Sequence, residues 1–172
     1  MLNLKKWLNL KFQLFIEIIY SFFPYFYRRY LTHCKGIPDN ELKYLQENLN
    51  LRVIKKIIFI GGGAIPYTAI FFNKIINPES FIIIEKSKPA SLAASRLLKK
   101  LDLKNFKAIN MRGEDYSDFD NSLIIVALQV TGKQNIVDKI LKKPCNNVLI
   151  IRQPLRKNMR MFESVSLNGL GY

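Results

Sequence analysis

The stretch KKIIFIGGGAIPYTAIFF, residues 55–72, decides how this sequence folds. Its first part is a short apolar run rich in isoleucine, which predicts a buried strand. Three consecutive glycines follow, and Pro66 then opens a second apolar run. Because proline is tolerated in the first turn of a helix, this second run is expected to be helical. A strand, a glycine turn and a helix in this order are typical of the first unit of an α/β fold.

The alternation of strands and helices continues along the chain. Strands are expected at residues 53–61, 80–87, 105–110, 121–129 and 146–153, and helices at 66–76, 87–101 and 132–143. Short apolar strands separated by helices indicate a parallel sheet that is covered on both faces. We therefore expect a doubly wound, mostly parallel α/β sheet of the Rossmann-like type. Ser87 is placed to cap the second of these helices, and residues 161–167 form a candidate edge strand.

The chain divides into a helical N-terminal segment, residues 1–50, and a Rossmann-like domain, residues 51–172. Within the first segment, THCKGIPDN (residues 32–40) predicts a turn, with Gly36 and Pro38 as breakers. Asp39 or Asn40 is expected to cap the amphipathic helix that follows at residues 40–51.

The most apolar part of the chain is its first segment, residues 1–30, in which residues 12–27 have Glu17 as their one charge. Residues 12–27 are shorter than the roughly 20 residues that a spanning helix needs, and Pro24 interrupts them. A signal peptide would need a small-residue cleavage site, which is absent. Basic residues on both sides also allow a helix in contact with a membrane surface. A helix packed on the domain or in a homodimer interface is the preferred interpretation.

The net charge of +14 comes from 27 basic and 13 acidic side chains. It suits a nucleic acid, an anionic membrane or an acidic small molecule, although a lysine-rich solvated surface explains it equally well. Cys34 and Cys145 with the single His33 are too few for the usual zinc site, so no metal is expected. One histidine also disfavours a Ser-His-Asp or Cys-His hydrolase. The cysteines are expected to be reduced thiols in a cytoplasmic protein.

The glycine loop departs from the common phosphate-binding loops. Read as a dinucleotide fingerprint, it has Gly61 and Gly63 but Pro66 where the third glycine belongs. No Gly-Lys-Ser/Thr follows, so it is no Walker loop either. The other frequent ligand of such a loop is S-adenosylmethionine (SAM), whose aminocarboxypropyl end lies against the glycines and carries no phosphate. Gly61, Gly62 and Gly63 would let that ligand approach the backbone closely.

A SAM site also needs an acid at the end of the second strand to bind the ribose hydroxyls. Glu85 stands there, at the end of FIIIE, and a solvated strand end is the plain alternative for it. After the third strand, RGED supplies Glu114 and Asp115 as groups for the adenine amine, or as an ordinary polar loop. Ile65, Pro66 and Leu128 complete the expected set of cofactor-binding residues.

With these residues, the sequence resembles the nicotianamine synthases. IIFIGGGAIPYTAIFF is similar to their SAM-binding loop, and FFPYFYRRY to an aromatic-proline segment upstream of it. LIIVALQVTGKQNIVDKIL and NVLIIRQ are similar to their fourth strand with its helix and to their fifth strand. The resemblance covers roughly residues 22–153, and much of it is shared by class I SAM-dependent methyltransferases in general.

The resemblance implies transfer of the 3-amino-3-carboxypropyl group of SAM onto an amine. An amine nucleophile must be deprotonated and aimed, so a carboxylate or a tyrosine near it is useful. The acid that the family carries on the helix before the sheet falls at Gln46, or at Glu47 if the register slips by one. Tyr25 and Tyr67 are further candidates for the substrate side, although each is also an ordinary core aromatic.

Two alternatives stay open at this point. The first is an ordinary SAM-dependent methyltransferase acting on a small molecule or, given the charge, on RNA, although no RNA-binding motif supports the latter. The second is a non-catalytic SAM-binding or interaction protein, in which the short tail after the fifth strand and Gln46 would reflect lost chemistry. A nicotinamide oxidoreductase is disfavoured by Pro66.

Overall fold

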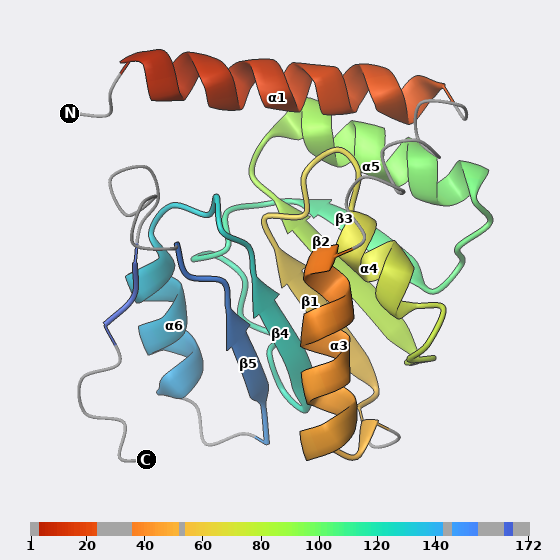
Figure 1. Cartoon of the computed structure of the whole chain (residues 1–172), viewed down its shortest axis with the longest axis vertical. Coiled ribbons are helices and arrows are strands. Elements are labelled where there is room, and N and C mark those ends of the chain that lie inside the picture. Colours follow the sequence, from red (N-terminus) through yellow and green to blue (C-terminus); the bar gives the residue numbers. More distant parts are fainter. Residues whose placement is uncertain (1–3, 24–35, 52–53, 143–145, 155–163, 167–172) are drawn as a thin grey trace.

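A computed structural model describes residues 4–23, 36–51, 54–142, 146–154 and 164–166. Its centre is a five-stranded sheet in which every pairing is parallel. The strands are β1 (Lys56–Ile60), β2 (Ser80–Glu85), β3 (Phe106–Asn110), β4 (Ser122–Val126) and β5 (Val148–Ile151), in the order β3-β2-β1-β4-β5. This order confirms the predicted doubly wound sheet (Figure 1).

The winding reverses at β1, whose two neighbours are β2 and β4. Ile60 at the end of β1 is in register with Ile84 on one side and with Val126 on the other. In sheets of this kind, ligands bind beyond the carboxyl ends of the strands at the point of reversal. That point is where the glycine loop begins.

Alternate residues of the central strands supply two hydrophobic layers. Ile57 and Phe59 belong to the layer that the helices α3 (Gly36–Asn48), α4 (Tyr67–Phe72) and α5 (Lys88–Lys100) cover. Ile58 and Ile60 face the opposite layer, which includes residues of α6 (Lys133–Leu141). Both faces of the sheet are therefore buried, which explains why the strands read as continuous apolar runs.

The N-terminal helix α1 (Leu4–Phe22) lies across α5, outside both layers (Figure 1). Leu14 and Ile18 of α1 pack against Ala90 and Ala93 of α5. The small alanine side chains let the two helices approach closely. Among the described residues, no helix combines the length and the apolarity needed to cross a membrane.

Local details differ from the sequence-based expectations at two helix starts. The prediction of a turn over residues 32–40 was wrong at its end, because α3 begins at Gly36 and takes Pro38 into its first turn. Proline is accepted there since the first N–H groups of a helix have no partner within it. Ser87 is the N-cap of α5, as predicted, but its side chain makes no capping bond. Most of the candidate strand at 161–167 lies outside the described residues, and residues 164–166 have no strand structure.

Candidate functional site

The glycine loop leaves the carboxyl end of β1 and leads directly into α4. Gly61 and Gly63 have φ angles of +84° and +66°, which only glycine adopts without strain. The backbone N–H of Gly61 donates to the Ile84 carbonyl oxygen at 2.8 Å, so the loop starts as an extension of the ladder between β1 and β2. The chain then turns away from the sheet at the point where the winding reverses, and residues 61–63 are partly exposed there.

The three glycines have different neighbours. A β-carbon on Gly61 would collide with the Val130 side chain, and one on Gly62 would collide with Ile83. Packing within the protein therefore already requires glycine at these two positions. A β-carbon on Gly63 would instead stand 2.9 Å from the carboxylate Oε2 of Glu17, which comes from α1. Of the three glycines, Gly63 is therefore the one that lies beside a charged side chain, the carboxylate of Glu17.

Glu85 joins this loop to the end of β2. The residue is only 9% exposed, and its Oε2 accepts a hydrogen bond from the Gly63 N–H at 3.0 Å. Its Oε1 accepts one from the Ser87 N–H at 2.8 Å. Each carboxylate oxygen can accept a further bond, so the group is fixed in place and still able to bind a pair of hydroxyls.

The loop after β3 brings one of its two acids inward. Glu114 is partly buried and pairs with Arg112, with 2.5 Å between Oε2 and Nη2. A β-carbon on Gly132 would collide with the Glu114 carboxylate, so this side chain reaches the start of α6. Asp115 is exposed, and its backbone N–H donates to the Arg112 carbonyl oxygen at 3.1 Å. Of the two, Glu114 is the one whose side chain is directed inward, toward Gly132 at the start of α6.

The remaining predicted residues around the loop are apolar. Ile65 and Pro66 are buried, and Ile65 belongs to the core under α4, which gives both a packing role of their own. Leu128 is partly buried in the segment between β4 and α6, directly after Ala127, whose N–H donates to the Ile60 carbonyl oxygen at 2.9 Å. The hydroxyl of Tyr67 is buried at the start of α4.

One of the predicted catalytic residues, Glu47, lies away from this loop. Glu47 lies near the end of α3 that precedes β1, whereas the glycine loop follows β1 at the opposite end of the strand (Figure 1). Its side chain is 60% exposed and pairs with Lys43 at 3.9 Å. Gln46 is exposed as well. Tyr25 lies outside the described residues.

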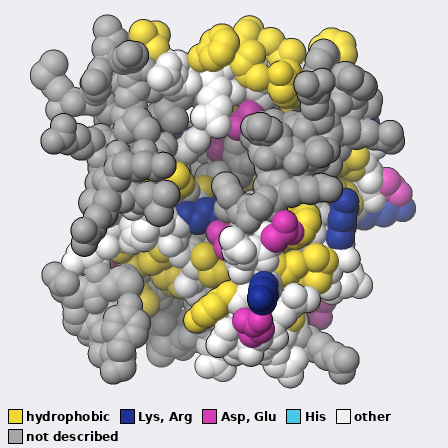
Figure 2. Space-filling view, in the orientation of Figure 1, with side chains coloured by type: hydrophobic (Ala, Val, Ile, Leu, Met, Phe, Trp, Pro, Cys, Tyr) yellow, Lys and Arg dark blue, Asp and Glu magenta, His cyan; other side chains and the backbone are white. Residues whose placement is uncertain are grey.

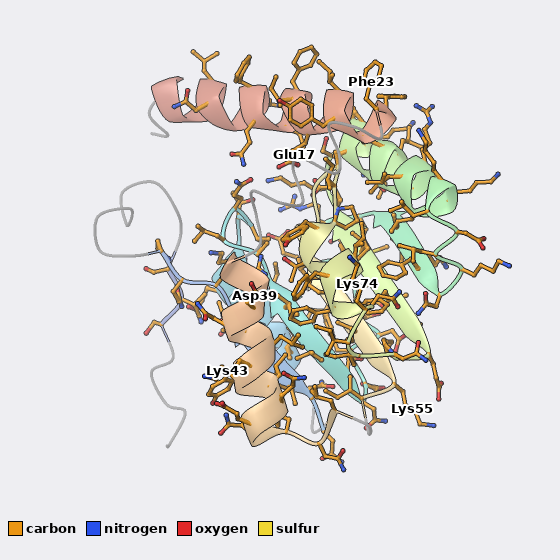
Figure 3. All side chains as sticks on the ribbon, turned by 45° about the vertical axis from the view of Figure 1, so that its right-hand side comes forward. Glu17, Phe23, Asp39, Lys43, Lys55 and Lys74 are labelled. Atoms are coloured by element: carbon orange, nitrogen blue, oxygen red, sulfur yellow. The ribbon has the colours of Figure 1, made fainter. Side chains whose placement is uncertain are left out.

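A different acid, Glu17, lies at the loop, and no role is predicted for it from the sequence. Glu17 points from the inner side of α1 toward the body of the protein (Figure 3). It is the only acidic residue in α1. An isolated acid in an apolar helix was the signal available in the sequence, because such a charge needs a reason to be there.

A second group that was missed lies on the other side of the loop. Arg152, directly after β5, donates from Nε and Nη2 to the two carboxylate oxygens of Glu41 at 2.6 and 2.7 Å. Its Nη2 also donates to Thr68 Oγ1 at 2.9 Å, and its carbonyl oxygen accepts from the fully buried Lys133 at 3.0 Å. This cluster fixes α3, α4, β5 and α6 around the carboxyl edge of the sheet.

The chemistry of this edge favours a cationic ligand that carries hydroxyls. Two carboxylates, those of Glu17 and Glu85, meet the loop at Gly63. They would repel a pyrophosphate placed there but attract an ammonium or a sulfonium. SAM carries both cationic groups and a ribose diol, so the residues present fit it. Among the described residues, no group of three or more His, Cys, Asp or Glu side chains could hold a metal ion; Cys34, Cys145 and His33 lie outside that part of the chain.

Solved structures of SAM-binding proteins have a fold similar to that of this chain. No family model matches this chain, and no curated protein sequence matches it at a significant level. A glutamate-to-glutamine mutant of the nicotianamine synthase MtNAS, in complex with S-adenosylmethionine, superposes with a TM-score of 0.72 at 16% identity. That match covers 96% of this chain and 66% of the other. MtNAS in complex with MTA and tNA gives 0.61 at 19% identity, over 84% of this chain and 52% of that one.

A SAM-dependent methyltransferase from Aquifex aeolicus is also similar, with a TM-score of 0.54 at 16% identity over 67% of this chain and 62% of that one. This chain therefore spans between about half and two thirds of the length of these proteins. At such identities the likeness shows the fold, which is the Rossmann-like fold of class I SAM-dependent methyltransferases and of MtNAS.

Proposed function

We propose that this chain is a SAM-dependent transferase of nicotianamine-synthase type, which moves the 3-amino-3-carboxypropyl group of SAM to a small-molecule amine. The observation that carries the proposal is the carboxylate of Glu85, which is held on the Gly63 N–H at the point where the sheet reverses. The fold shared with MtNAS and with SAM-dependent methyltransferases supports the same cofactor.

The residues around the loop divide the binding of SAM between them. The backbone of residues 61–63 would lie beside the aminocarboxypropyl end, and Glu85 would accept hydrogen bonds from the ribose hydroxyls. Glu114, or Asp115 after a side-chain movement, would bind the adenine amine, with Ile65, Pro66 and Leu128 as apolar neighbours. When bound, SAM supplies a carbon activated by its bond to a sulfonium.

Glu17 favours transfer to an amine over transfer of methyl to a neutral acceptor. Amines are protonated at neutral pH, so a carboxylate beside the loop would attract the acceptor and take up its proton. Because Glu17 meets Gly63, where the aminocarboxypropyl end would lie, that acceptor would be held close to the transferred group. The buried hydroxyl of Tyr67 lies at the start of the helix that follows the loop, and Tyr67 is retained as a second candidate on the substrate side.

The nucleoside by-product tests the proposal directly. The protein is incubated with SAM and a panel of amines, and the products are separated by liquid chromatography and mass spectrometry. Methylthioadenosine is the expected product. S-adenosylhomocysteine would instead identify an ordinary methyltransferase, the second candidate, which the likeness to the Aquifex aeolicus enzyme favours. SAM binding without either product would identify a non-catalytic SAM-binding protein.

Replacing Glu17 by glutamine separates a catalytic role from a structural one. We expect Glu17→Gln to lower methylthioadenosine formation by about 100-fold or more even at saturating SAM, because the acceptor loses its base. The matched control is Glu47→Gln, which tests the sequence-based assignment and is expected to keep full activity. A Glu17→Gln variant with normal turnover, or a Glu47→Gln variant without it, would contradict this assignment.

The cytoplasmic location is proposed on chemical grounds alone. The chain has two cysteines and a single histidine, a composition that suits reduced thiols more than a disulfide framework. Thiol titration of the protein purified without reductant should find both cysteines reactive after denaturation; a disulfide would argue for an oxidising compartment.

A further inference from the structure

The outer face of α1 is a continuous apolar surface. Four large side chains on it and a fifth directly after it are between 49% and 66% exposed, and we call them the phenylalanine stripe: Leu8, Phe12, Phe15, Phe22 and Phe23. Steps of three, four and seven residues place such side chains on one side of a helix. In Figure 2, hydrophobic side chains gather along the edge of the molecule where α1 lies in Figure 1.

The stripe is not what attaches α1 to the protein. The opposite side of the helix does that, through Leu14 and Ile18 against α5 and through Glu17 at the glycine loop. Five large side chains that are about half exposed offer on the order of 500 Å² of apolar surface, which is near the upper end for a single patch on a monomer. Such a patch indicates a surface that contacts something else.

The charges beside the stripe are positive. The Arg96 guanidinium of α5 lies 5.7 Å from the centre of the Phe22 ring, and Lys100 Nζ donates to the Phe22 carbonyl oxygen at 3.3 Å. Helix α5 carries Lys88, Arg96, Lys99 and Lys100, all exposed, and no acidic residue. The one acid of α1, Glu17, is turned inward. An apolar stripe is thus bordered by cations with no acid of α1 or α5 beside it.

We propose that the outer face of α1 binds an anionic lipid surface, with the helix lying in the plane of the headgroups. Phenylalanine and leucine side chains would enter the boundary between headgroups and acyl chains, while Arg96 and Lys100 would contact the lipid phosphates. The net charge of +14 would add long-range attraction to the same surface. This inference is independent of the reaction that the site performs.

A second copy of the chain fits the same face less well. A two-fold pairing of stripes would cover on the order of 1,000 Å² in total, below the roughly 1,600 Å² of a standard interface. Neither α1 nor α5 offers an outward-facing acid that could pair with Arg96 and Lys100 of a second copy. An anionic membrane satisfies both the apolar stripe and its basic border.

Vesicle flotation tests the proposal with the full chain. We expect the protein to float with vesicles rich in phosphatidylserine and to stay in the dense fraction with pure phosphatidylcholine. The double variant Phe12→Ser, Phe15→Ser should weaken binding by about tenfold or more, because it removes two side chains that would be buried in lipid. The matched control is Ile75→Ser, an apolar side chain after α4 that is 47% exposed and should leave binding unchanged.

A second variant tests the electrostatic part on its own. Arg96→Gln, Lys100→Gln keeps the stripe and should weaken binding by about fivefold per charge at low salt. If the serine variant loses helical circular dichroism, this second variant alone decides. Equal binding to neutral vesicles, no binding to anionic ones, or binding unaffected by the glutamine variant would overturn the proposal. A dimer in light scattering that the serine variant converts to monomer would identify a second copy as the occupant and also overturn it.

Discussion

Replacing Glu85 by glutamine tests the central contact of the proposed SAM site. The wild-type carboxylate accepts hydrogen bonds from Gly63 N–H and Ser87 N–H at 3.0 and 2.8 Å. Glutamine keeps the shape, but its amide NH₂ would face one of these donors or a ribose hydroxyl. Losing one charge-assisted bond to the ribose would weaken SAM binding by about 1–3 kcal/mol, or roughly 5- to 150-fold in Kd.

Calorimetric titration with SAM measures this change, and circular dichroism at the same temperature measures the folded fraction. The second measurement is needed because a backbone N–H left facing a donor also lowers the free energy of unfolding, by about 1–3 kcal/mol. The matched control is Glu79→Gln, directly before the same strand, where the side chain is 71% exposed and pairs with Lys55 at 3.2 Å. A folded Glu85→Gln protein that binds SAM as wild type does, or a control that loses binding equally, would refute the assignment of Glu85.

Three further predictions concern stability and the loop. Glu41→Ala should lower the free energy of unfolding in urea by about 2–3 kcal/mol, because it leaves Arg152 partly buried without its carboxylate. Glu47→Ala on the same helix should lower the free energy of unfolding by under about 0.5 kcal/mol, since its ion pair with Lys43 is exposed. Equal losses in the two variants would contradict the expected difference between a partly buried and an exposed ion pair. Gly63→Ala, at φ +66°, should cost about 1–2 kcal/mol and reduce SAM affinity in calorimetry; an unchanged affinity would argue against ligand contact at the loop. Burial raises the pKa of Tyr116 above 10.0, so the stability it contributes is complete below pH 10.0 and is lost as the pH rises through the raised value. Thermal melts should therefore show a smaller alkaline loss for Tyr116→Phe; equal losses would contradict it.

The sheet could be predicted from the sequence because each strand carries its own local signal. The run before Gly61 is apolar at every position, and Ile57, Ile58, Phe59 and Ile60 are all buried in the structure. A strand that is covered on both faces needs apolar side chains at every position. Such a run can therefore be recognised without knowing which strands lie beside it. The start of α3 was harder to predict. Gly36 and Pro38 usually interrupt a helix, but the first turn of a helix accepts both.

The acids around the loop could not be predicted in the same way, because their positions depend on long-range packing. Glu41 and Arg152 are 111 residues apart, and neither segment alone indicates that they meet. The position of Glu17 at Gly63 depends on which side of α1 packs against α5. Since α1 is apolar on both sides, its hydrophobic pattern could not identify the inner one. Glu47 was chosen from a resemblance at the helix before the sheet, where a shift of one position decides between a glutamine and a glutamate.

The packing of α1 on α5 has a consequence for biosynthesis. Leu14 of α1 and Ala93 of α5 are separated by roughly 80 residues, so at ordinary elongation rates α1 leaves the ribosome on the order of 4–16 s before α5 does. During that interval the side of α1 that will cover α5 is as uncovered as the phenylalanine stripe. A nascent chain of this protein therefore presents an apolar helix to chaperones, to other chains and to any nearby bilayer before its own domain can shelter it.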